Sequence, residues 1–145
     1  MINTVEPNGD NGLHLQLPWP PRNLFPNVHQ HWQVKARDAR LVKRAGRFIA
    51  MERGVTHDKK KHYRVTLVFC PPSRRHFDRD NLLAAMKHTL DGMCQGLGID
   101  DNNIKPVTEM GPVVGMPGKV EATIVEITDP REWIVELPDE EKTPD

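Results

Sequence analysis

The placement of proline most constrains the fold of this 145-residue chain. An alternating apolar and polar segment, residues 13–17, ends at the run Pro-Trp-Pro-Pro of residues 18–21. A second segment, residues 63–70, is rich in β-branched and aromatic side chains and ends at Pro71 and Pro72. Because proline lacks the amide hydrogen that an interior strand donates, it marks strand ends. We therefore expect two strands, the first of them half buried.

Two helices are expected from the spacing of apolar residues. Residues 32–53 are free of proline and rich in Ala, Arg and Lys, which predicts a basic amphipathic helix. Its expected apolar face is Val34, Leu41, Ala45, Phe48 and Ile49. A second helix is predicted over residues 81–97, and its expected core face is Leu82, Met86, Leu90, Met93 and Leu97. Gly96 and Gly98 are expected to end it.

The rest of the chain predicts two more strands and two tails. Residues 105–110 and 120–127 have strand patterns, and the segment 111–118 between them is rich in turn residues. The order β-α-β-α-β-β indicates an α/β (α+β) domain with a small mixed sheet and two main helices. A chain of this length has room for one domain, which we expect over residues 13–128. Residues 1–12 are expected to form a flexible tail, and residues 129–145 an acidic, disordered one.

The apolar runs and the two cysteines indicate where the protein is located and what state its thiols are in. The chain has no apolar run near the roughly 18 residues needed to span a bilayer, and its first residues lack the plan of a secretory signal. We therefore expect a cytoplasmic protein with no membrane partner. Cys70 and Cys94 have neither CxxC spacing nor a nearby His pair, so buried thiols are expected rather than a disulfide or a zinc site.

The charges are unevenly distributed, although the net charge is zero. Residues 29–75 contain thirteen Lys and Arg against three acids, a local charge of +10, whereas residues 100–145 have a local charge of −8. A basic stretch is a typical footprint for a phosphate backbone. The alternative is a solvated helix face that balances the acidic end. We favour the footprint because the basic stretch adjoins an acidic motif.

That motif contains Asp78 and Asp80, and a second acidic pair, Asp100 and Asp101, follows twenty residues later. Magnesium prefers carboxylate oxygens, water and substrate phosphate as ligands, so these carboxylates predict a metal-dependent phosphodiesterase site. If the backbone there is extended, Asp78 and Asp80 project to the same side and can reach one ion. The neighbouring cations that would hold the phosphate are Arg74, Arg75 and Arg79.

Each of these residues also has an ordinary structural interpretation. Asp78 or Asp80 can cap the following helix, a role that suits Asp80 well. The run of residues 100–103 can be a turn, because Asp and Asn favour turns. Asp91 is expected to pair with Lys87, four residues before it. The sequence has neither the spacing of an EF-hand nor a nucleophile triad.

Taken together, the motifs carry a family resemblance. Leu17-Pro18-Trp19-Pro20-Pro21 with Asn23, then Asp78-Arg79-Asp80-Asn81-Leu82-Leu83, Lys87, Leu90-Asp91-Gly92 and Gly98-Ile99-Asp100-Asp101-Asn102 resemble the RusA family of Holliday junction resolvases. The resemblance covers roughly residues 13–128. It implies a homodimeric endonuclease that depends on Mg²⁺, with Mn²⁺ as a possible substitute, and cuts four-way DNA in recombination and repair.

The resemblance also implies residue roles. The catalytic residues would be Asp78, Asp80, Asp101 and Lys87. The metal ligands would be Asp78, Asp80, Asp100 and Asp101. The expected DNA contacts are Arg22, Asn23, His31, Arg74, Arg75, Arg79 and Asn81. For His31, which lies in an H-x-H run, polar surface or a helix start is the ordinary alternative.

The length of the second predicted helix raises a geometric problem. A continuous helix of about 16 residues is ~24 Å long, so Asp101 at its far end cannot easily reach Asp78 of the same chain. In a two-fold dimer with antiparallel helices, Asp101 of one subunit would meet the Asp78 and Asp80 pair of the other. A break in the helix at Gly92 is the competing explanation.

Two other classes of function stay open at this point. A non-catalytic protein that binds branched DNA would need the basic residues and would use the aspartates only in caps and turns. An interaction protein would instead use the acidic tail as its binding surface.

Overall fold

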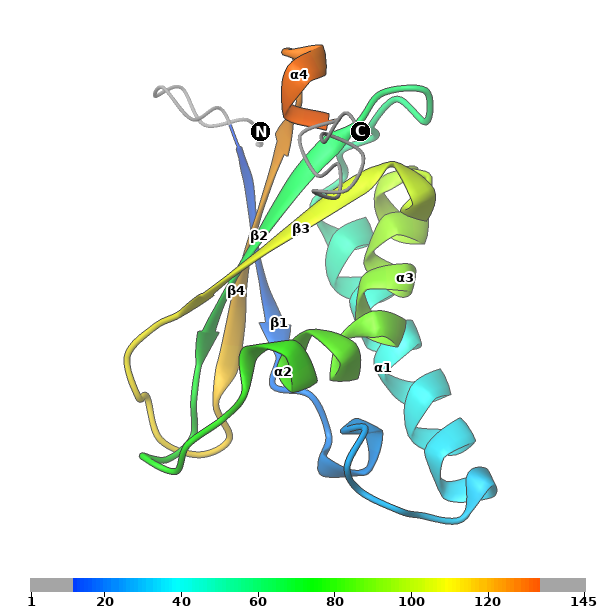
Figure 1. Cartoon of the computed structure of the whole chain (residues 1–145). Helices are drawn as coiled ribbons and strands as arrows, with labels where there is room; N and C mark the ends of the chain where they lie inside the picture. The colour runs from blue at the N-terminus through cyan, green and yellow to red at the C-terminus, as the bar shows by residue number, and fades with distance from the viewer. Residues whose placement is uncertain (1–11, 134–145) are drawn as a thin grey trace, which may run out of the picture.

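The structure, a computed structural model, describes residues 12–133. The elements in chain order are β1 (Leu13–Pro18), η1 (Arg22–Leu24), α1 (Trp32–Glu52), β2 (Tyr63–Cys70), α2 (Arg79–Ala85), α3 (Lys87–Leu97), η2 (Asp101–Asn103), β3 (Ile104–Met110), β4 (Lys119–Glu126) and α4 (Pro130–Trp133). The fold is a mixed α+β arrangement in which helices lie against one face of a four-stranded sheet (Figure 1). The predicted strands are confirmed to within one residue at each end.

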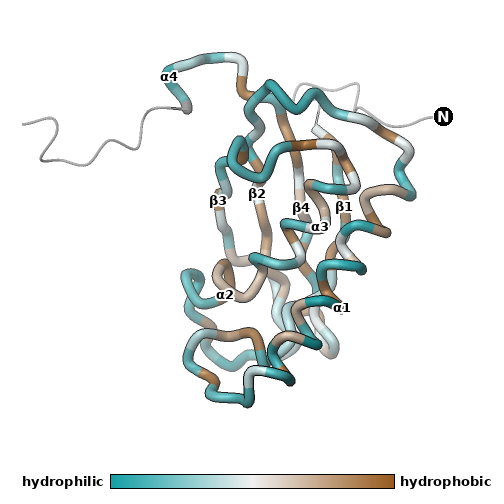
Figure 2. The backbone as a smooth tube through the Cα atoms, turned by 90° about the vertical axis from the view of Figure 1, so that its right-hand side faces the viewer, coloured by the Kyte–Doolittle hydropathy of each residue, from teal (hydrophilic) through white to brown (hydrophobic). Residues whose placement is uncertain are grey.

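The sheet has the strand order β1-β4-β2-β3. Strand β4 comes last in the chain but lies between β1 and β2 in the sheet, and it is antiparallel to both. Its residue Ala122 therefore pairs with Leu15 on one side and with Leu67 on the other. The pair β2 and β3 is parallel, which requires a crossover, and α2 and α3 supply it. Figure 2 shows the apolar residues concentrated on the central strands β2 and β4, whereas the edge strand β3 is more polar.

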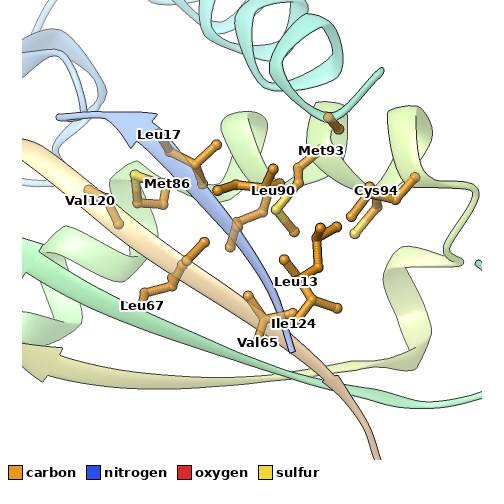
Figure 3. Packing of buried hydrophobic residues seen from close by; sticks show 14 of the residues in the cluster. Leu13, Leu17, Val65, Leu67, Met86, Leu90, Met93, Cys94, Val120 and Ile124 are labelled. Atoms are coloured by element: carbon orange, nitrogen blue, oxygen red, sulfur yellow. The ribbon is translucent and has the colours of Figure 1, made fainter. Parts of the chain in front are cut away.

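The core lies between this sheet and the helices. Alternate strand residues point into it, including Leu13, Leu15 and Leu17 of β1 and Val65, Leu67 and Phe69 of β2, each at most 3% exposed. Figure 3 shows Met86, Leu90 and Met93 packed over Leu17, Leu67 and Val120. The predicted core face of the second helix is therefore confirmed in full, because Leu82 and Leu97 are buried as well.

The prediction of one continuous second helix was wrong. The chain leaves helical geometry at Met86, where φ is −89° and ψ is −2°, and two helices result, α2 and α3. The Met86 amide donates to the carbonyls of Leu82 and Leu83, which closes α2, while its own carbonyl accepts from the Leu90 amide. The change of direction lets Leu82 and Met86 stay buried on the twisted sheet while α2 runs across the end of α3 (Figure 1). Gly98, with φ at +76°, ends α3 as expected, whereas Gly96, which was also expected to end it, lies inside the helix.

The bounds of α1 agree with the prediction, but its expected apolar face was only partly right. Ile49 packs against the core, and Val34 and Ala45 are partly buried. Leu41 is 52% exposed and Phe48 is 62% exposed, whereas the buried residues are Val42, Gly46 and Ala50. The reason is the close approach of α1 to α3. A Cβ built on Gly46 or on Gly92 would collide with backbone of the facing helix, at the carbonyl oxygens of Thr89 and Lys43 respectively. Small residues therefore face the partner helix, and larger ones face outward.

The segment that follows β4 begins with a short helix, α4. Glu132 of this helix forms a 2.7 Å ion pair with Arg64 of β2, and its carbonyl oxygen accepts a 3.0 Å hydrogen bond from the Lys105 ammonium of β3. These contacts fix α4 on the sheet. The rest of the predicted acidic tail, and residues 1–11 of the predicted N-terminal tail, lie outside the described residues.

Within residues 12–133, no helix combines the length and the apolar composition needed to cross a membrane. Cys70 and Cys94 are buried, unpaired thiols, as the sequence predicted.

Candidate functional site

The first acidic pair lies at the start of α2. Asp78 is the N-cap: its Oδ1 accepts the backbone amides of Asp80 at 2.8 Å and Asn81 at 3.1 Å. The capping interpretation is thus confirmed for Asp78 and was wrong for Asp80, which lies in the first turn. The expected extended backbone through Asp80 was also wrong, because only Asp78 is extended and α2 begins at Arg79. Both carboxylates are exposed.

A cleft of about 630 Å³ opens beside Asp78, and we call it the Asp78 cleft. Its polar lining includes Asp78, Asn81, Arg22, Arg75 and His76, and its apolar lining includes Trp19, Phe25, Phe77, Met116 and Pro117. These residues come from three loops and the start of α2, which the ends of β1, β2 and β3 bring together. The cleft therefore combines one carboxylate with several cationic side chains and aromatic rings.

The second acidic pair lies at the other end of α3. Asp100 caps η2 through Oδ1, which accepts the Asn102 amide at 2.9 Å, so the predicted turn is confirmed. Asp100 and Asp101 line a second cavity of about 400 Å³, which we call the Asp101 pocket. Lys43, Lys59, Asp91 and Cys94 line the same pocket.

The charges of the Asp101 pocket act on a buried thiol. Burial, followed by the nearby carboxylates of Asp101, Asp91 and Asp100, raises the pKa of Cys94 to about 12. Cys94 therefore stays protonated at neutral pH and is a poor nucleophile. The pocket wall thus combines an inert thiol with three carboxylates and the two ammonium groups of Lys43 and Lys59.

One chain does not bring the two acidic pairs together. Among residues 12–133, no three His, Cys, Asp or Glu side chains are close enough to hold a metal ion jointly. Figure 1 shows why, since α2 and the turn η2 lie at opposite ends of α3. The helix break that the sequence offered as a competing explanation was predicted at the wrong residue, because Gly92 lies inside α3. The actual break, at Met86, does not bring the two acidic pairs together.

Lys87 and Asp91 form the expected pair. The Lys87 ammonium lies 3.6 Å from Asp91 Oδ2, in the i,i+4 arrangement. Lys87 is exposed at the start of α3 and lines neither the Asp78 cleft nor the Asp101 pocket. Its side chain is instead part of the wall of a third cavity between α1 and the helices of the crossover.

The structure separates the expected DNA contacts into two groups. Arg22, Arg75 and Asn81 line the Asp78 cleft, and Arg74 is exposed in the loop beside it. The other three have structural partners. The Asn23 amide donates to Asp38 at 2.8 Å, His31 caps α1 by accepting the Gln33 amide at 3.1 Å, and the Arg79 guanidinium donates to the Thr108 carbonyl at 3.2 Å. For His31 the helix-start interpretation is therefore confirmed.

A row of cations covers the outer side of α1. Arg37, Arg40, Arg44 and Arg47 are exposed, and Lys35 and Lys43 are partly exposed. Within this row, Arg37 lies 3.5 Å from Asp38, which offsets part of its charge. Six of the thirteen Lys and Arg residues of the basic stretch thus lie on α1.

Sequence reasoning missed the aromatic lining of the Asp78 cleft. Trp19 meets Phe77 edge to face, with ring centroids 5.1 Å apart and 74° between their planes. The position of Phe77 directly before Asp78 and of Trp19 directly after β1 was the available signal. For Met116 and Pro117, which come from the loop between β3 and β4, the sequence gives no such signal.

Comparisons with known proteins give one clear relative. An uncharacterized protein of Xylella fastidiosa (strain Temecula1) is 31% identical over 117 residues, which cover 79% of this chain and 76% of that protein. No protein-family model matches the chain. Solved structures of the periplasmic domain of Helicobacter pylori MotB include one of residues 78–256, at TM-score 0.43 and 15% identity over 94% of this chain and 90% of that one. Another, of residues 90–256, also gives TM-score 0.43 and 15% identity, over 95% and 88% of the two chains. By its similarity over most of both sequences, the chain belongs to the same family as the Xylella fastidiosa protein.

Proposed function

We propose that this protein is a homodimeric, Mg²⁺-dependent endonuclease that cuts four-way DNA junctions, similar to the RusA resolvases. The observation that carries the proposal is the Asp78 cleft, in which an exposed carboxylate adjoins Arg22, Arg75 and Asn81. Phosphodiester cleavage needs cationic side chains to hold the phosphate and carboxylates to hold a metal ion beside it. The motif set that resembles the RusA family supports the assignment.

The carboxylate oxygens suit Mg²⁺, but a complete metal site needs residues from two subunits. Asp78 uses Oδ1 for the helix cap, and its second oxygen, Oδ2, can bind a cation. Asp80 and Asp101 are exposed carboxylates at opposite ends of the crossover. In our proposal, Asp78 and Asp80 of one subunit meet Asp101 of the partner, with Asp100 as a further ligand. The separation of the two pairs within one chain is what makes dimerisation necessary.

Different residues of the chain have different roles in the proposed cleavage. Arg22 and Arg75 bind the scissile phosphate and bring it to Asp78, which lines the same cleft, and towards Asp80 in the first turn of α2. Bound Mg²⁺ supplies polarisation of the phosphate and a water of lowered pKa. The carboxylates hold the positive charge close to the phosphate oxygens, where negative charge grows in the transition state. Lys87 lines neither the Asp78 cleft nor the Asp101 pocket, so in our proposal it acts from the partner subunit.

The basic surface of α1 supplies affinity for the DNA arms. Its cations, Arg37, Arg40, Arg44 and Arg47, are exposed and face outward. Each phosphate that they neutralise releases counterions, so binding weakens as salt rises. Such contacts carry no sequence information, and the preference for a four-way junction would therefore arise from its shape and from the geometry of the dimer.

A second candidate is a non-catalytic protein that binds branched DNA. The capping roles of Asp78 and Asp100 favour it, because each of these carboxylates already has a structural purpose. Such a protein would use the same basic surface and would bind a junction without cutting it.

A junction assay separates these candidates. A labelled four-way junction is incubated with wild-type protein, Asp80→Asn or Glu109→Gln, each with Mg²⁺ and with EDTA. Asp80 is suited to the test because it does not provide the cap of α2, and Glu109 is an exposed acid on β3 that serves as the matched control. We expect cleavage by the wild type and Glu109→Gln in Mg²⁺ only, and at least a hundredfold loss in Asp80→Asn with binding retained. Binding without cleavage by the wild type would favour the second candidate.

A further inference from the structure

The Asp78 cleft contains more aromatic surface than the cleavage of a phosphodiester requires. Trp19, Phe25 and Phe77 line it, and each is only partly buried although it packs against the core. The Arg75 guanidinium carbon lies 5.4 Å from the centre of the Phe77 ring. Partly exposed aromatic rings beside a guanidinium form a surface on which a flat ring can stack.

The cleft also has the size and rigidity of a ligand site. Its volume of about 630 Å³ falls within the range of roughly 300–1,000 Å³ that small-molecule sites occupy. Pro20, Pro72 and Pro117 form part of its walls, and the fixed φ of proline limits how far those walls can move. Met116, which is 83% exposed, adds a pliable apolar side chain from the loop between β3 and β4.

The polar residues of the cleft indicate a ligand that is anionic as well as flat. The two guanidinium groups of Arg22 and Arg75 outnumber the single carboxylate of Asp78 in its lining. Guanidinium groups bind phosphate oxygens with two parallel hydrogen bonds, and the Asn81 amide offers both a donor and an acceptor to the edge of a base. A nucleotide combines these properties in one molecule. An apolar peptide would leave the cations unpaired.

We propose that the Asp78 cleft binds one unpaired nucleotide of the DNA, next to the phosphate that is cut. This inference rests on the proposed function. The base stacks on Phe77, while Trp19, whose ring plane is tilted by 74° from that of Phe77, borders the stacked base. Its phosphate contacts Arg22 and Arg75 beside Asp78. Bases at a branch point leave the stack at a lower cost than bases inside a duplex. The cleft would therefore direct cleavage to positions where a base can unstack.

The test measures binding in EDTA, where no cleavage occurs. Labelled junctions carry one abasic nucleotide, placed in turn at each position that flanks the branch point, and they are compared with the intact junction. The variant is Phe77→Leu, which keeps the apolar volume and removes the aromatic ring. The control is Trp32→Leu, which removes an exposed ring at the start of α1 that does not line the Asp78 cleft. We expect Phe77→Leu to weaken binding of the intact junction about tenfold, as the loss of one stacked base does.

The test depends on whether the Phe77→Leu change and the abasic nucleotide weaken binding independently of each other. At one position in each strand, the abasic nucleotide should weaken wild-type binding by the same factor and should have no further effect in Phe77→Leu. The assignment would be overturned if the two losses multiplied at every position, or if Trp32→Leu weakened binding as much as Phe77→Leu does. So would a folded Phe77→Leu protein, verified by circular dichroism, that binds the intact junction normally.

A single-stranded oligonucleotide separates failure of the cleft from failure of the proposed function. If the wild type ignores the junction but binds the single strand in a manner that depends on Phe77, the nucleotide site stands and the junction function falls. If neither DNA is bound through Phe77, the nucleotide site is refuted. Binding of a proline-rich peptide through Phe77 in place of DNA would also refute it.

Discussion

Asp78 combines a structural role with a proposed chemical one. Its Oδ1 holds the start of α2 by accepting two backbone amides, and its charge lies at the edge of the Asp78 cleft. The two roles need different properties of the side chain. A cap requires only an acceptor oxygen, which Asn also has, whereas binding of a cation by a carboxylate requires the negative charge.

Two substitutions of Asp78 therefore give different predictions. Asp78→Asn should keep the free energy of unfolding within about 0.5 kcal/mol of the wild-type value and abolish cleavage of the junction. Asp78→Ala should abolish cleavage and also lower the free energy of unfolding by about 0.5–2 kcal/mol, because α2 loses its cap. Urea denaturation and the junction assay measure the two effects. An Asp78→Asn protein that cuts at the wild-type rate would restrict this residue to capping.

His57 should make stability depend on pH. Burial lowers its pKa, an effect partly offset by the Leu97 carbonyl and the charge of Glu126. Because its pKa is lower in the folded protein, the unfolded chain binds the proton first as pH falls. The contribution of neutral His57 is therefore fully present above pH 6.5 and is lost as pH falls through the folded pKa.

The matched comparison is His57→Gln, followed by urea denaturation at pH 7.5 and pH 5.5. The wild type should lose more free energy of unfolding between these two values than the variant, whose side chain does not titrate. Equal losses in the two proteins would show that other groups cause the acid sensitivity.

At the scale of elements, the contact between α1 and α3 depends on glycine. A Cβ on Gly92 would collide with the Lys43 carbonyl oxygen, and one on Gly96 would lie 2.6 Å from the Arg47 carbonyl oxygen. These are backbone atoms of a long helix, so they cannot move aside without shifting α1. The close approach matters for function, because Lys43 of α1 lines the Asp101 pocket.

We predict that Gly92→Ala lowers the free energy of unfolding by about 1–3 kcal/mol, the usual cost of overpacking. Gly54→Ala is the comparison, since nothing lies within 4 Å of a Cβ there and the substitution reports only the cost of its positive φ of 66°. Urea denaturation gives both values. A Gly92→Ala protein no less stable than Gly54→Ala would mean that the two helices are less tightly packed than described.

Some parts of the fold could be predicted from the sequence, whereas the contact between α1 and α3 could not. The strand positions could be predicted from the alternation of apolar and polar residues and from proline, because both act locally. The ends of α1 could be predicted from its lack of proline. The buried face of α1 did not follow, since ranking residues by apolar size selects Leu41 and Phe48 and overlooks Gly46. The break at Met86 was also hidden, because Met86 continues the apolar repeat and only the packing against the sheet requires the turn.

For the candidate site, local patterns again succeeded where tertiary contacts were not involved. The turn at residues 100–103 and the pair of Lys87 with Asp91 depend on residues that are close in sequence. The Asp78 cleft depends on three separate loops that meet only after the sheet forms, so Met116 and Pro117 could not be assigned to it in advance.

At the scale of the whole molecule, the proposed metal site requires two subunits. One described chain holds Asp78 and Asp80 at one end of the crossover and Asp101 at the other, and no three metal-binding side chains meet among residues 12–133. If the proposed function is correct, the metal ligands must be completed by a second copy. Each dimer would then have two equivalent sites, which suits the paired cuts that resolve a four-way junction.

Cleavage by defined heterodimers tests this claim most directly. Subunits with two different affinity tags are mixed, and heterodimers of Asp80→Asn with Asp101→Asn are isolated, as are heterodimers of wild type with the double variant Asp80→Asn/Asp101→Asn. With shared sites, the first heterodimer keeps one intact site and nicks the junction in Mg²⁺, while the second has no intact site and is inactive. The opposite pattern, an inactive first heterodimer and an active second one, would contradict the shared site.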